Sequence, residues 1–254
     1  MIKKAIRSLV RKLGYDFVRY DKDRRHNFPA DFESRHIEII ERVIPYTITS
    51  HERIYALIES VRYVLRNDTK GDFLECGVYK GGSMMTIALT LISEGVRDRD
   101  LYLFDTFEGM PVPGERDIDL LGKPALDTFS KSKISDVSST WTNAPLDDVK
   151  QAMALTGYPV ERIHFVKGLV ENTIPEKAPE AIALLRLDTD WYQSTIHELI
   201  NLYPRLSPKG VVLIDDYGHF KGAREAVDEY CQKNKIAPFL HRIDYTGRLI
   251  IKNG

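Results

Sequence analysis

Two hydrophobic patterns alternate along the chain from about residue 50 onward. Long stretches with apolar residues at three- and four-residue spacing predict amphipathic helices, and short continuous apolar runs predict buried strands. Thr49 and Ser50 precede the first helical stretch and are candidates for its N-cap. The expected helices are residues 51–67, 81–95, 146–157, 194–207 and 223–234, and the expected strands are residues 72–78, 100–106, 162–168, 182–188, 210–216, 238–244 and 247–252.

The order of these elements predicts an α/β fold. Strands that alternate with helices are typical of a Rossmann-like, doubly wound, mostly parallel sheet with helices on both faces. We expect seven strands, of which the last two form a C-terminal antiparallel hairpin. The length favours one such domain, over residues 46–254. Ligands of these sheets bind beyond the carboxyl ends of the strands.

Residues 1–45 are expected to form an N-terminal amphipathic helix and a linker. One helical face would carry Ile2, Ile6, Leu9, Val10 and Leu13, and basic residues without any acid surround it. Such a helix could contact an anionic membrane surface or a second subunit of a homo-oligomer, or it could simply dock on its own domain. The following polar stretch, residues 20–31, indicates a loop or linker.

Composition narrows the choice of partner and compartment. The chain has 36 basic and 37 acidic side chains, so no overall field favours nucleic acid as a partner. The two cysteines, Cys76 and Cys231, fall in a predicted strand and a predicted helix, which indicates a reducing compartment rather than a disulfide scaffold. We find neither a membrane span nor a signal peptide and expect a cytoplasmic location, with membrane association as an alternative.

The first expected strand leads into a glycine-rich turn, "LECGVYKGGS" at residues 74–83. Glycines allow a tight turn, and free amides at the start of the next helix favour electron-rich groups. The turn lacks the dinucleotide fingerprint and the phosphate-binding loop pattern, because Tyr79 and Lys80 occupy its middle. A close-packed turn without ligand is the alternative. We assign to a cofactor site Glu75, Gly77, Tyr79, Gly81, Gly82 and Ser83.

Asp105 ends the second strand, 28 residues after Gly77. An acid at this place is typical of a ribose anchor, although the usual separation is about 20 residues. A longer helix explains the difference. The turn and Asp105 together indicate a site for a nucleoside that needs no phosphate group.

Carboxylates cluster where two further strands end, at "LLRLDTDWYQST" and "VVLIDDYGH". Asp188, Asp215 and Asp216 can converge on a hard cation such as Mg²⁺, which prefers oxygen ligands. Asp190 lies two residues after Asp188, just past the end of the strand, and is free to act as a general base. The alternative is that these acids cap the helices that follow.

Weaker candidates flank the acids. His219 could contact substrate or be an ordinary loop histidine, and Trp191 and Tyr192 could stack on a sugar or belong to the core. Residues 107–145 are too long for an ordinary connection and are a candidate lid over the substrate.

Five motifs together resemble the macrocin O-methyltransferase family, the TylF type of class I S-adenosylmethionine-dependent enzymes. They are "DFLECGVYKGGS", "LFDTFEGMP", "RLDTDWYQST", "NLYPRLSPKG" and "IDDYGHFKGAREAVDEY", spread from about residue 45 to about residue 250. The resemblance implies Mg²⁺-dependent methyl transfer to a sugar hydroxyl, often on an antibiotic, and an assembly larger than a monomer. It implies metal ligation by Asp188, Asp215 and Asp216, general-base action by Asp190, and S-adenosylmethionine binding by Glu75, Gly77, Gly81, Ser83, Asp188 and, at the ribose, Asp105.

The resemblance does not identify the acceptor. The basic N-terminal helix is unexpected for a soluble antibiotic substrate and favours a lipid-linked saccharide or glycolipid as an alternative. Two other functions stay open. Residues 188–190 could be the metal-binding D-x-D motif of a nucleotide-sugar glycosyltransferase, or the chain could bind S-adenosylmethionine without catalysis.

Overall fold

The computed structural model describes residues 6, 10 and 28–253. The expected helix over residues 2–13 therefore lies outside the described residues, apart from Ile6 and Val10. The chain divides into two compact units, Met1–Ile37 and Glu38–Gly254. In the described residues, no helix is both long enough and apolar enough to cross a bilayer.

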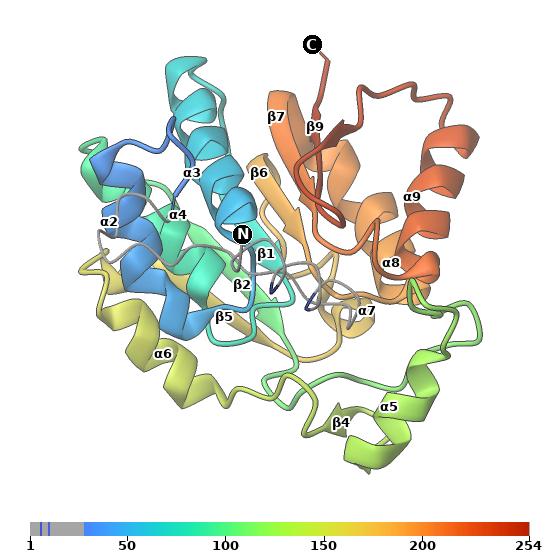
Figure 1. The fold of residues 1–254 in the computed structure, drawn as a ribbon. Coiled ribbons are helices and arrows are strands. Elements are labelled where there is room, and N and C mark those ends of the chain that lie inside the picture. The colour runs from blue at the N-terminus through green and yellow to red at the C-terminus, as the bar shows by residue number, and fades with distance from the viewer. Residues whose placement is uncertain (1–5, 7–9, 11–27, 254) are drawn as a thin grey trace. The chain divides into compact units, whose positions relative to one another are not determined.

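The second unit contains a seven-stranded sheet, whose strands have the order β5-β2-β1-β6-β7-β9-β8 (Figure 1). The first five of these strands are parallel, and β9 runs antiparallel to both β7 and β8. The expected sheet and its C-terminal hairpin are confirmed. The strands are β1 (Asp72–Cys76), β2 (Leu101–Asp105), β5 (Ile163–Lys167), β6 (Ile182–Leu187), β7 (Leu206–Ile214), β8 (His241–Arg242) and β9 (Arg248–Ile251).

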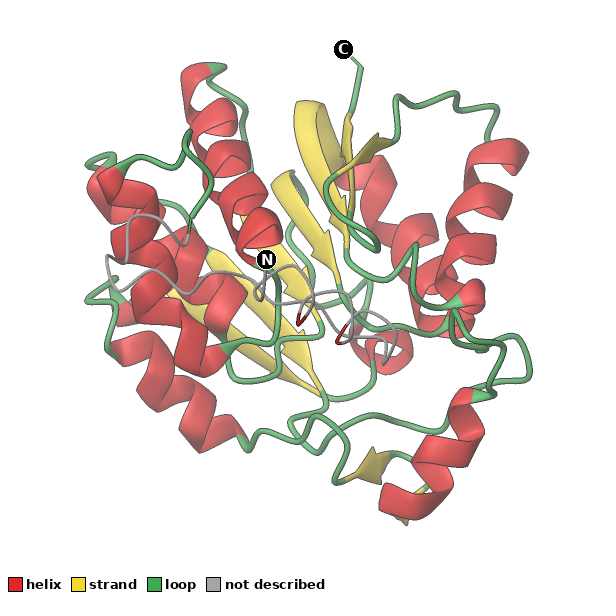
Figure 2. Cartoon of the chain, viewed as in Figure 1, coloured by secondary structure: helices red, strands yellow, loops and turns green. Residues whose placement is uncertain are grey.

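Helices pack on both faces of this sheet (Figure 2). On one face α3 contacts β6, β7 and α4, and α4 in turn contacts α6; on the other face α8 contacts β6, α7 and α9. Ser50 caps α3 as expected, because its side chain accepts a hydrogen bond from the Arg53 amide. The helices are α3 (His51–Arg66), α4 (Gly82–Ser93), α6 (Leu146–Ala154), α7 (Val170–Thr173), α8 (Tyr192–Leu202) and α9 (Lys221–Lys233).

Other elements occur where no regular structure was expected. Helix α2 (Ser34–Val43) lies within the segment taken as a linker, and Ile39, Ile40 and Val43 are buried. The candidate lid contains α5 (Ala125–Ser132) and a short hairpin of β3 (Lys133–Ser135) and β4 (Ser138–Ser139). The elements of the candidate lid are short, so their apolar residues repeat too few times to give a clear periodicity. In α2 the buried positions 36, 39, 40 and 43 do have helical spacing.

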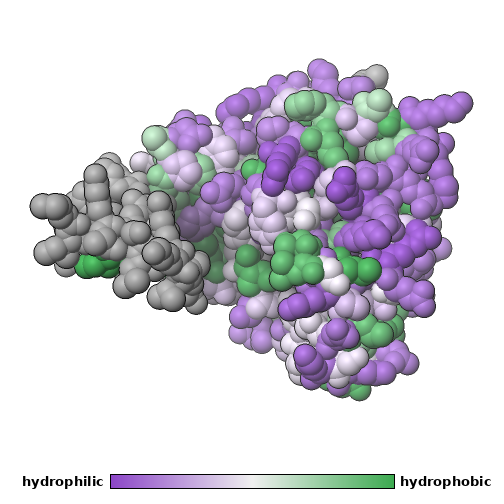
Figure 3. All heavy atoms as spheres, turned by 45° about the vertical axis from the view of Figure 1, so that its right-hand side comes forward, coloured by the Kyte–Doolittle hydropathy of each residue, from purple (hydrophilic) through white to green (hydrophobic). Residues whose placement is uncertain are grey.

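The core lies between the sheet and the helices. Strand residues such as Leu74, Leu185 and Val212 are fully buried and pack in one cluster with Leu202 and Val227 from α8 and α9. The face of the molecule drawn in Figure 3 is mostly hydrophilic, with smaller groups of apolar side chains. Because the strands are buried on both faces, their sequences are continuous apolar runs. Polar residues follow where the strands end, at the carboxyl edge of the sheet.

Candidate active site

A cavity of about 300 Å³ opens beyond the carboxyl ends of β1, β2, β6 and β7. Its wall also includes residues 46–49, which precede α3, and the first residues of the segment 107–145. Among the predicted site residues, those in the wall are Gly77, Tyr79, Gly82, Ser83, Asp105, Asp188, Asp190, Asp215, Asp216 and His219. Of the other predicted residues, Glu75, Gly81, Trp191 and Tyr192 are not among the described residues that line it.

The glycine-rich turn packs tightly against the strand next to it. Gly77 has φ +82°, and a methyl group there would overlap the backbone carbonyl of Asp188. Gly81 has φ +91° and is the N-cap of α4, and Gly82 lies against the backbone of Tyr46. Left-handed backbone at the first two positions favours glycine. The beginning of the turn thus lies against the end of β6 at Asp188, and the start of α4 lies against the segment 46–49.

Asp105 holds this turn in place. Its carboxylate accepts hydrogen bonds from the amides of Val78 (2.6 Å), Tyr79 (3.1 Å) and Phe107 (2.6 Å). Burial raises its pKa, and the backbone amides oppose that rise. Asp105 lies in the cavity wall, so its predicted contact with a ribose stays a prediction.

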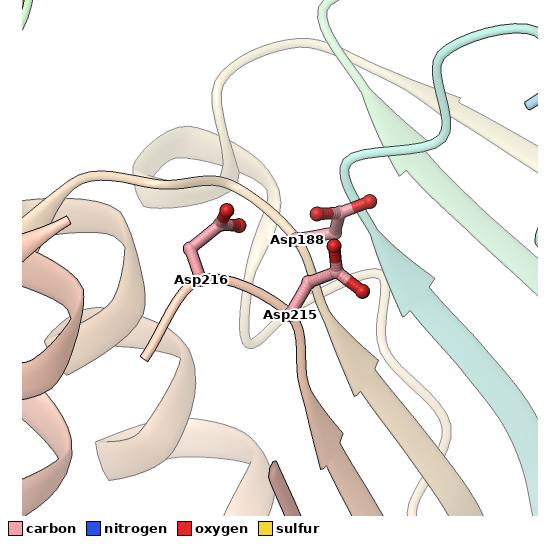
Figure 4. Close-up of side chains that lie close together, drawn as sticks. All are labelled: Asp188, Asp215 and Asp216. Carbon is pink, nitrogen blue, oxygen red and sulfur yellow. The ribbon is translucent and has the colours of Figure 1, made fainter. Parts of the chain in front are cut away.

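Three carboxylates converge beyond the ends of β6 and β7. Asp188, Asp215 and Asp216 each offer a ligand oxygen, and these oxygens lie within 4.8 Å of one another (Figure 4). Asp216 Oδ2 is buried and has no hydrogen-bond partner among the described residues. Oxygen donors at this separation, one of them an orphaned buried oxygen, fit a hard divalent cation. Burial raises the pKa of Asp188 and of Asp216 well above the ordinary value, and the neighbouring carboxylates add to this rise. A bound cation would reverse that shift.

Asp190 lies in the same cavity, two residues after Asp188. Its φ of +66° places it in the left-handed region, which aspartate tolerates better than most residues. The Trp191 amide donates to the Thr189 carbonyl at 2.7 Å and closes the turn that contains Asp190. Burial raises the pKa of Asp190 to about 7. A carboxylate that titrates near neutral pH is well matched to general-base chemistry.

Two arginines that the sequence analysis did not single out hold the acids. Arg186 is buried and ion-paired with Glu75, Asp188 and Asp215. Burial alone would lower the pKa of Arg186, but the three acids raise it well above the ordinary value. Arg53, in the first turn of α3, is ion-paired with Asp215. A charged residue inside the apolar run "IALLRLD" was the available signal for Arg186.

Arg53 also connects the site to the C-terminal hairpin. Its Nε lies 3.0 Å from Asp244 Oδ2, and the Thr246 hydroxyl donates to the Asp215 carbonyl at 2.7 Å. These contacts join residues that are 191 and 31 positions apart in the chain. The turn between β8 and β9 is therefore part of the scaffold that positions Asp215.

The remaining candidates lie around the cavity. His219 is in the wall with its ring edge-on to Phe220, and burial lowers its pKa, which favours the neutral ring. Trp191 is buried against Phe220 and Trp141. Tyr192 donates to Glu229 at 2.8 Å. Glu75 lies behind the wall, where burial raises its pKa to about 7.

The candidate lid is tied to the domain by buried polar contacts. The Trp191 indole donates to the Pro111 carbonyl at 3.1 Å. Asp117, only 2% exposed, accepts hydrogen bonds from the amides of Tyr192 (2.8 Å) and Gly114 (2.7 Å). Met110, Pro111 and Trp141 from this segment form part of the cavity wall.

Solved structures of similar fold are methyltransferases. The O-methyltransferase NovP has 29% sequence identity and a TM-score of 0.72, with 82% of this chain and 83% of NovP covered. Calicheamicin methyltransferase CalS11 has 17% sequence identity and a TM-score of 0.57, with 92% of this chain and 99% of CalS11 covered. This second likeness supports the fold alone. The chain thus has the fold of the class I methyltransferases.

Sequence comparison identifies the family. The model of the macrocin O-methyltransferase (TylF) family matches residues 8–252. Demethyldecarbamoylnovobiocin O-methyltransferase of Streptomyces niveus is 31% identical over 202 residues, which are 80% of this chain and 74% of that protein. Mycinamicin III 3''-O-methyltransferase of Micromonospora griseorubida is 31% identical over 204 residues, or 80% and 77%. The chain belongs to the macrocin O-methyltransferase family and is an O-methyltransferase of the S-adenosylmethionine-dependent class.

Proposed function

We propose that the protein is a Mg²⁺-dependent enzyme that moves the methyl group of S-adenosylmethionine to a sugar hydroxyl of a glycosylated natural product or saccharide. The observation that carries the proposal is the acidic cluster. Asp188, Asp215 and Asp216 offer oxygens within 4.8 Å of one another, and Asp190 lies in the same cavity as these three acids. A purely binding module has no need of a base beside a set of metal ligands.

The relatives support the choice of acceptor. One is named as a 4'-O-methyltransferase of a dimethoxy-rhamnosyl tetracenomycin, from Streptomyces olivaceus, and is 32% identical over 204 residues. Its name specifies a sugar-bearing compound, and sugars offer neighbouring hydroxyls that can share one cation. We extend to this chain the sugar class of acceptor and leave the particular compound open.

The cofactor would be held by the glycine-rich turn and by Asp105, and the cation by the three aspartates. A divalent cation at that place supplies Lewis acidity, which makes a nearby hydroxyl more acidic. Asp190 would accept the proton of the acceptor hydroxyl, because methyl transfer to oxygen needs a more nucleophilic oxygen than a neutral alcohol offers. Met110, Pro111 and Trp141 would exclude water from the cavity that the acids also line.

Calorimetric titration tests the proposal. Wild-type protein and Asp216→Ala are titrated with S-adenosylmethionine and then with Mg²⁺. Asp216 is the ligand of choice because its Oδ2 has no partner among the described residues, whereas Asp215 also anchors two arginines. We expect both proteins to bind the cofactor and only the wild type to bind Mg²⁺. Absence of cofactor binding in the wild type would contradict the proposal, and nucleotide sugars would then be titrated to test the glycosyltransferase alternative.

A homo-oligomer and peripheral membrane contact stay predictions. The homo-oligomer rests on the family resemblance, with the basic N-terminal segment as a candidate contact. The membrane contact rests on that segment alone, whose sequence predicts an amphipathic helix. Co-sedimentation with anionic liposomes, compared between the full chain and a chain that begins at residue 28, tests the membrane contact. Equal sedimentation of the two chains would refute a role for the segment.

A further inference from the structure

Arg186 is a buried cation on the floor of the acidic cluster. It lies on β6, only 4% of its side chain is exposed, and it is not among the described residues that line the cavity. Its neighbours on the sheet explain its position. Glu75 of β1 is its register partner, and Asp188 follows two residues later, so that both side chains share the face of Arg186.

The guanidinium group contacts acids from three adjacent strands. Its Nη1 donates to Glu75 Oε1 and Asp188 Oδ2, each at 2.6 Å, and its Nη2 donates to Asp215 Oδ1 at 2.5 Å. Nη2 also reaches the Thr49 hydroxyl at 3.4 Å. One rigid fork therefore fixes the carboxylates at the ends of β6 and β7 from behind, on the side away from the cavity.

We infer that Arg186 is the positioning residue of the divalent-cation site: its fork holds one oxygen of Asp188 and one of Asp215, so that their carboxylates converge with Asp216. The inference rests on the cation part of the proposed function. Residues that orient metal ligands typically change metal affinity by 10–100-fold when they are altered.

The geometry requires arginine rather than just a positive charge. Lysine would keep the charge but would place it on one compact ammonium, which cannot span acids on three strands. Arg53 is ion-paired with Asp215 as well, but it lies in the cavity wall and forms no ion pair with Asp188 or Glu75 in the described residues. Arg186 is thus the arginine that is ion-paired with acids at the ends of both β6 and β7.

Arg62 provides a matched control. It is another buried arginine that is ion-paired with two acids, Glu59 and Glu94, and none of these three residues lines the described cavity. Arg186→Lys and Arg62→Lys make the same chemical change at arginine side chains that are 4% and 0% exposed. A general loss of stability would affect both variants, whereas a positioning role concerns only the first.

The experiment is calorimetric titration with Mg²⁺ alone, in the absence of cofactor and acceptor, on the wild type and both lysine variants. We expect Mg²⁺ affinity to fall roughly 10–100-fold in Arg186→Lys and to stay within about twofold of the wild type in Arg62→Lys. Unchanged affinity in Arg186→Lys would overturn the inference but leave the proposed function standing. No Mg²⁺ binding by the wild type would overturn the cation site itself, and the inference with it.

A second pair of variants applies if Arg186→Lys does not fold. Glu75→Gln keeps an oxygen for the guanidinium, and Glu75→Ala removes this anchor without touching a metal ligand. We expect Mg²⁺ affinity near the wild-type value for the glutamine variant and about tenfold weaker for the alanine variant. Equal Mg²⁺ affinities in these two variants would overturn the inference.

Discussion

At the scale of single residues, Asp190 gives the sharpest prediction. Asparagine has nearly the same shape and also tolerates the left-handed region, so Asp190→Asn should keep the φ of +66° and remove only the basic oxygen. We expect turnover to fall by about 10²–10⁴-fold, the usual contribution of a general base. Single-turnover methyl transfer measures this, with whichever acceptor the wild type methylates.

Binding measurements distinguish that loss from damage to the site. Affinity for S-adenosylmethionine and for Mg²⁺ should stay near the wild-type value in Asp190→Asn. Asp136→Asn changes an exposed acid in the segment 107–145 and serves as the control, with turnover unaltered. Near-normal turnover in Asp190→Asn would remove Asp190 from the mechanism.

Gly77 carries a second residue-scale prediction. A methyl group there would meet the Asp188 carbonyl in a backbone conformation with φ +82°. We expect Gly77→Ala to lower the free energy of unfolding by about 2–5 kcal/mol, because backbone strain and overlap act together. Gly95→Ala is the matched control: its φ is +77° and nothing lies within 4 Å, so only the strain of about 1–2 kcal/mol applies. Urea denaturation of both variants tests this, and equal losses would contradict the overlap.

The acids of the site could be predicted from sequence, but their pairing with particular arginines could not. Parallel strands end at one edge, so acids that close two apolar runs must meet there. The contact between Arg186 and Glu75 joins residues 111 positions apart, and that between Arg53 and Asp215 joins residues 162 apart. Which basic side chain reaches which acid depends on strand order and register, and local patterns do not contain these.

At the scale of elements, the segment 107–145 gives the clearest test. Asp117 fastens it to the domain by accepting a hydrogen bond from the Tyr192 amide, and it accepts a second one from Gly114 within the segment. Gly222 leaves room for the carboxylate. Asp117→Ala leaves two amides without their ionised partner, a loss of roughly 1.5–3 kcal/mol for each bond. We expect this cost to appear as local opening, measured as several-fold faster tryptic cleavage after Lys131, which is exposed and followed by Ser132.

The control for this prediction lies in the same segment. Asp136 is exposed and pairs with Lys133, and such surface pairs contribute little to stability. Asp136→Ala should therefore be cleaved at the wild-type rate. Equal cleavage of Asp117→Ala and the wild type would show that other contacts hold the segment.

Element prediction succeeded where periodicity was long. The predicted helix over residues 51–67 is α3, with seven residues buried over its sixteen. In α5 only Ala125 and Phe129 are buried, so one repeat of the pattern was present and the helix was not expected. The mostly parallel sheet followed from the alternation of strands and helices, whereas the docking of the segment 107–145 depends on single long-range contacts such as those of Asp117 with Tyr192 and of Pro111 with Trp191.

At the scale of the whole molecule, the site is assembled from segments across residues 38–254. The site combines the ends of β1, β2, β6 and β7 with the start of α3 and the turn between β8 and β9. The amide of Gly218, which follows β7, donates to the carbonyl of Thr246 in that turn at 3.0 Å. A ligand that contacts several of these segments can bind only when all are in place. Ligand binding should therefore stabilise the whole domain against unfolding.

The size of that stabilisation follows from mass action. At 100 times its dissociation constant a ligand adds about 2.7 kcal/mol, which corresponds to a rise in Tm of roughly 5–10 °C for a domain of this size. We expect Mg²⁺ to raise the Tm of the wild type in this way and to have no effect on Asp216→Ala, while S-adenosylmethionine raises the Tm of both. Differential scanning calorimetry measures these shifts. An equal Mg²⁺ shift in the wild type and in Asp216→Ala would place the cation elsewhere, because the variant lacks one of the three carboxylates that converge there.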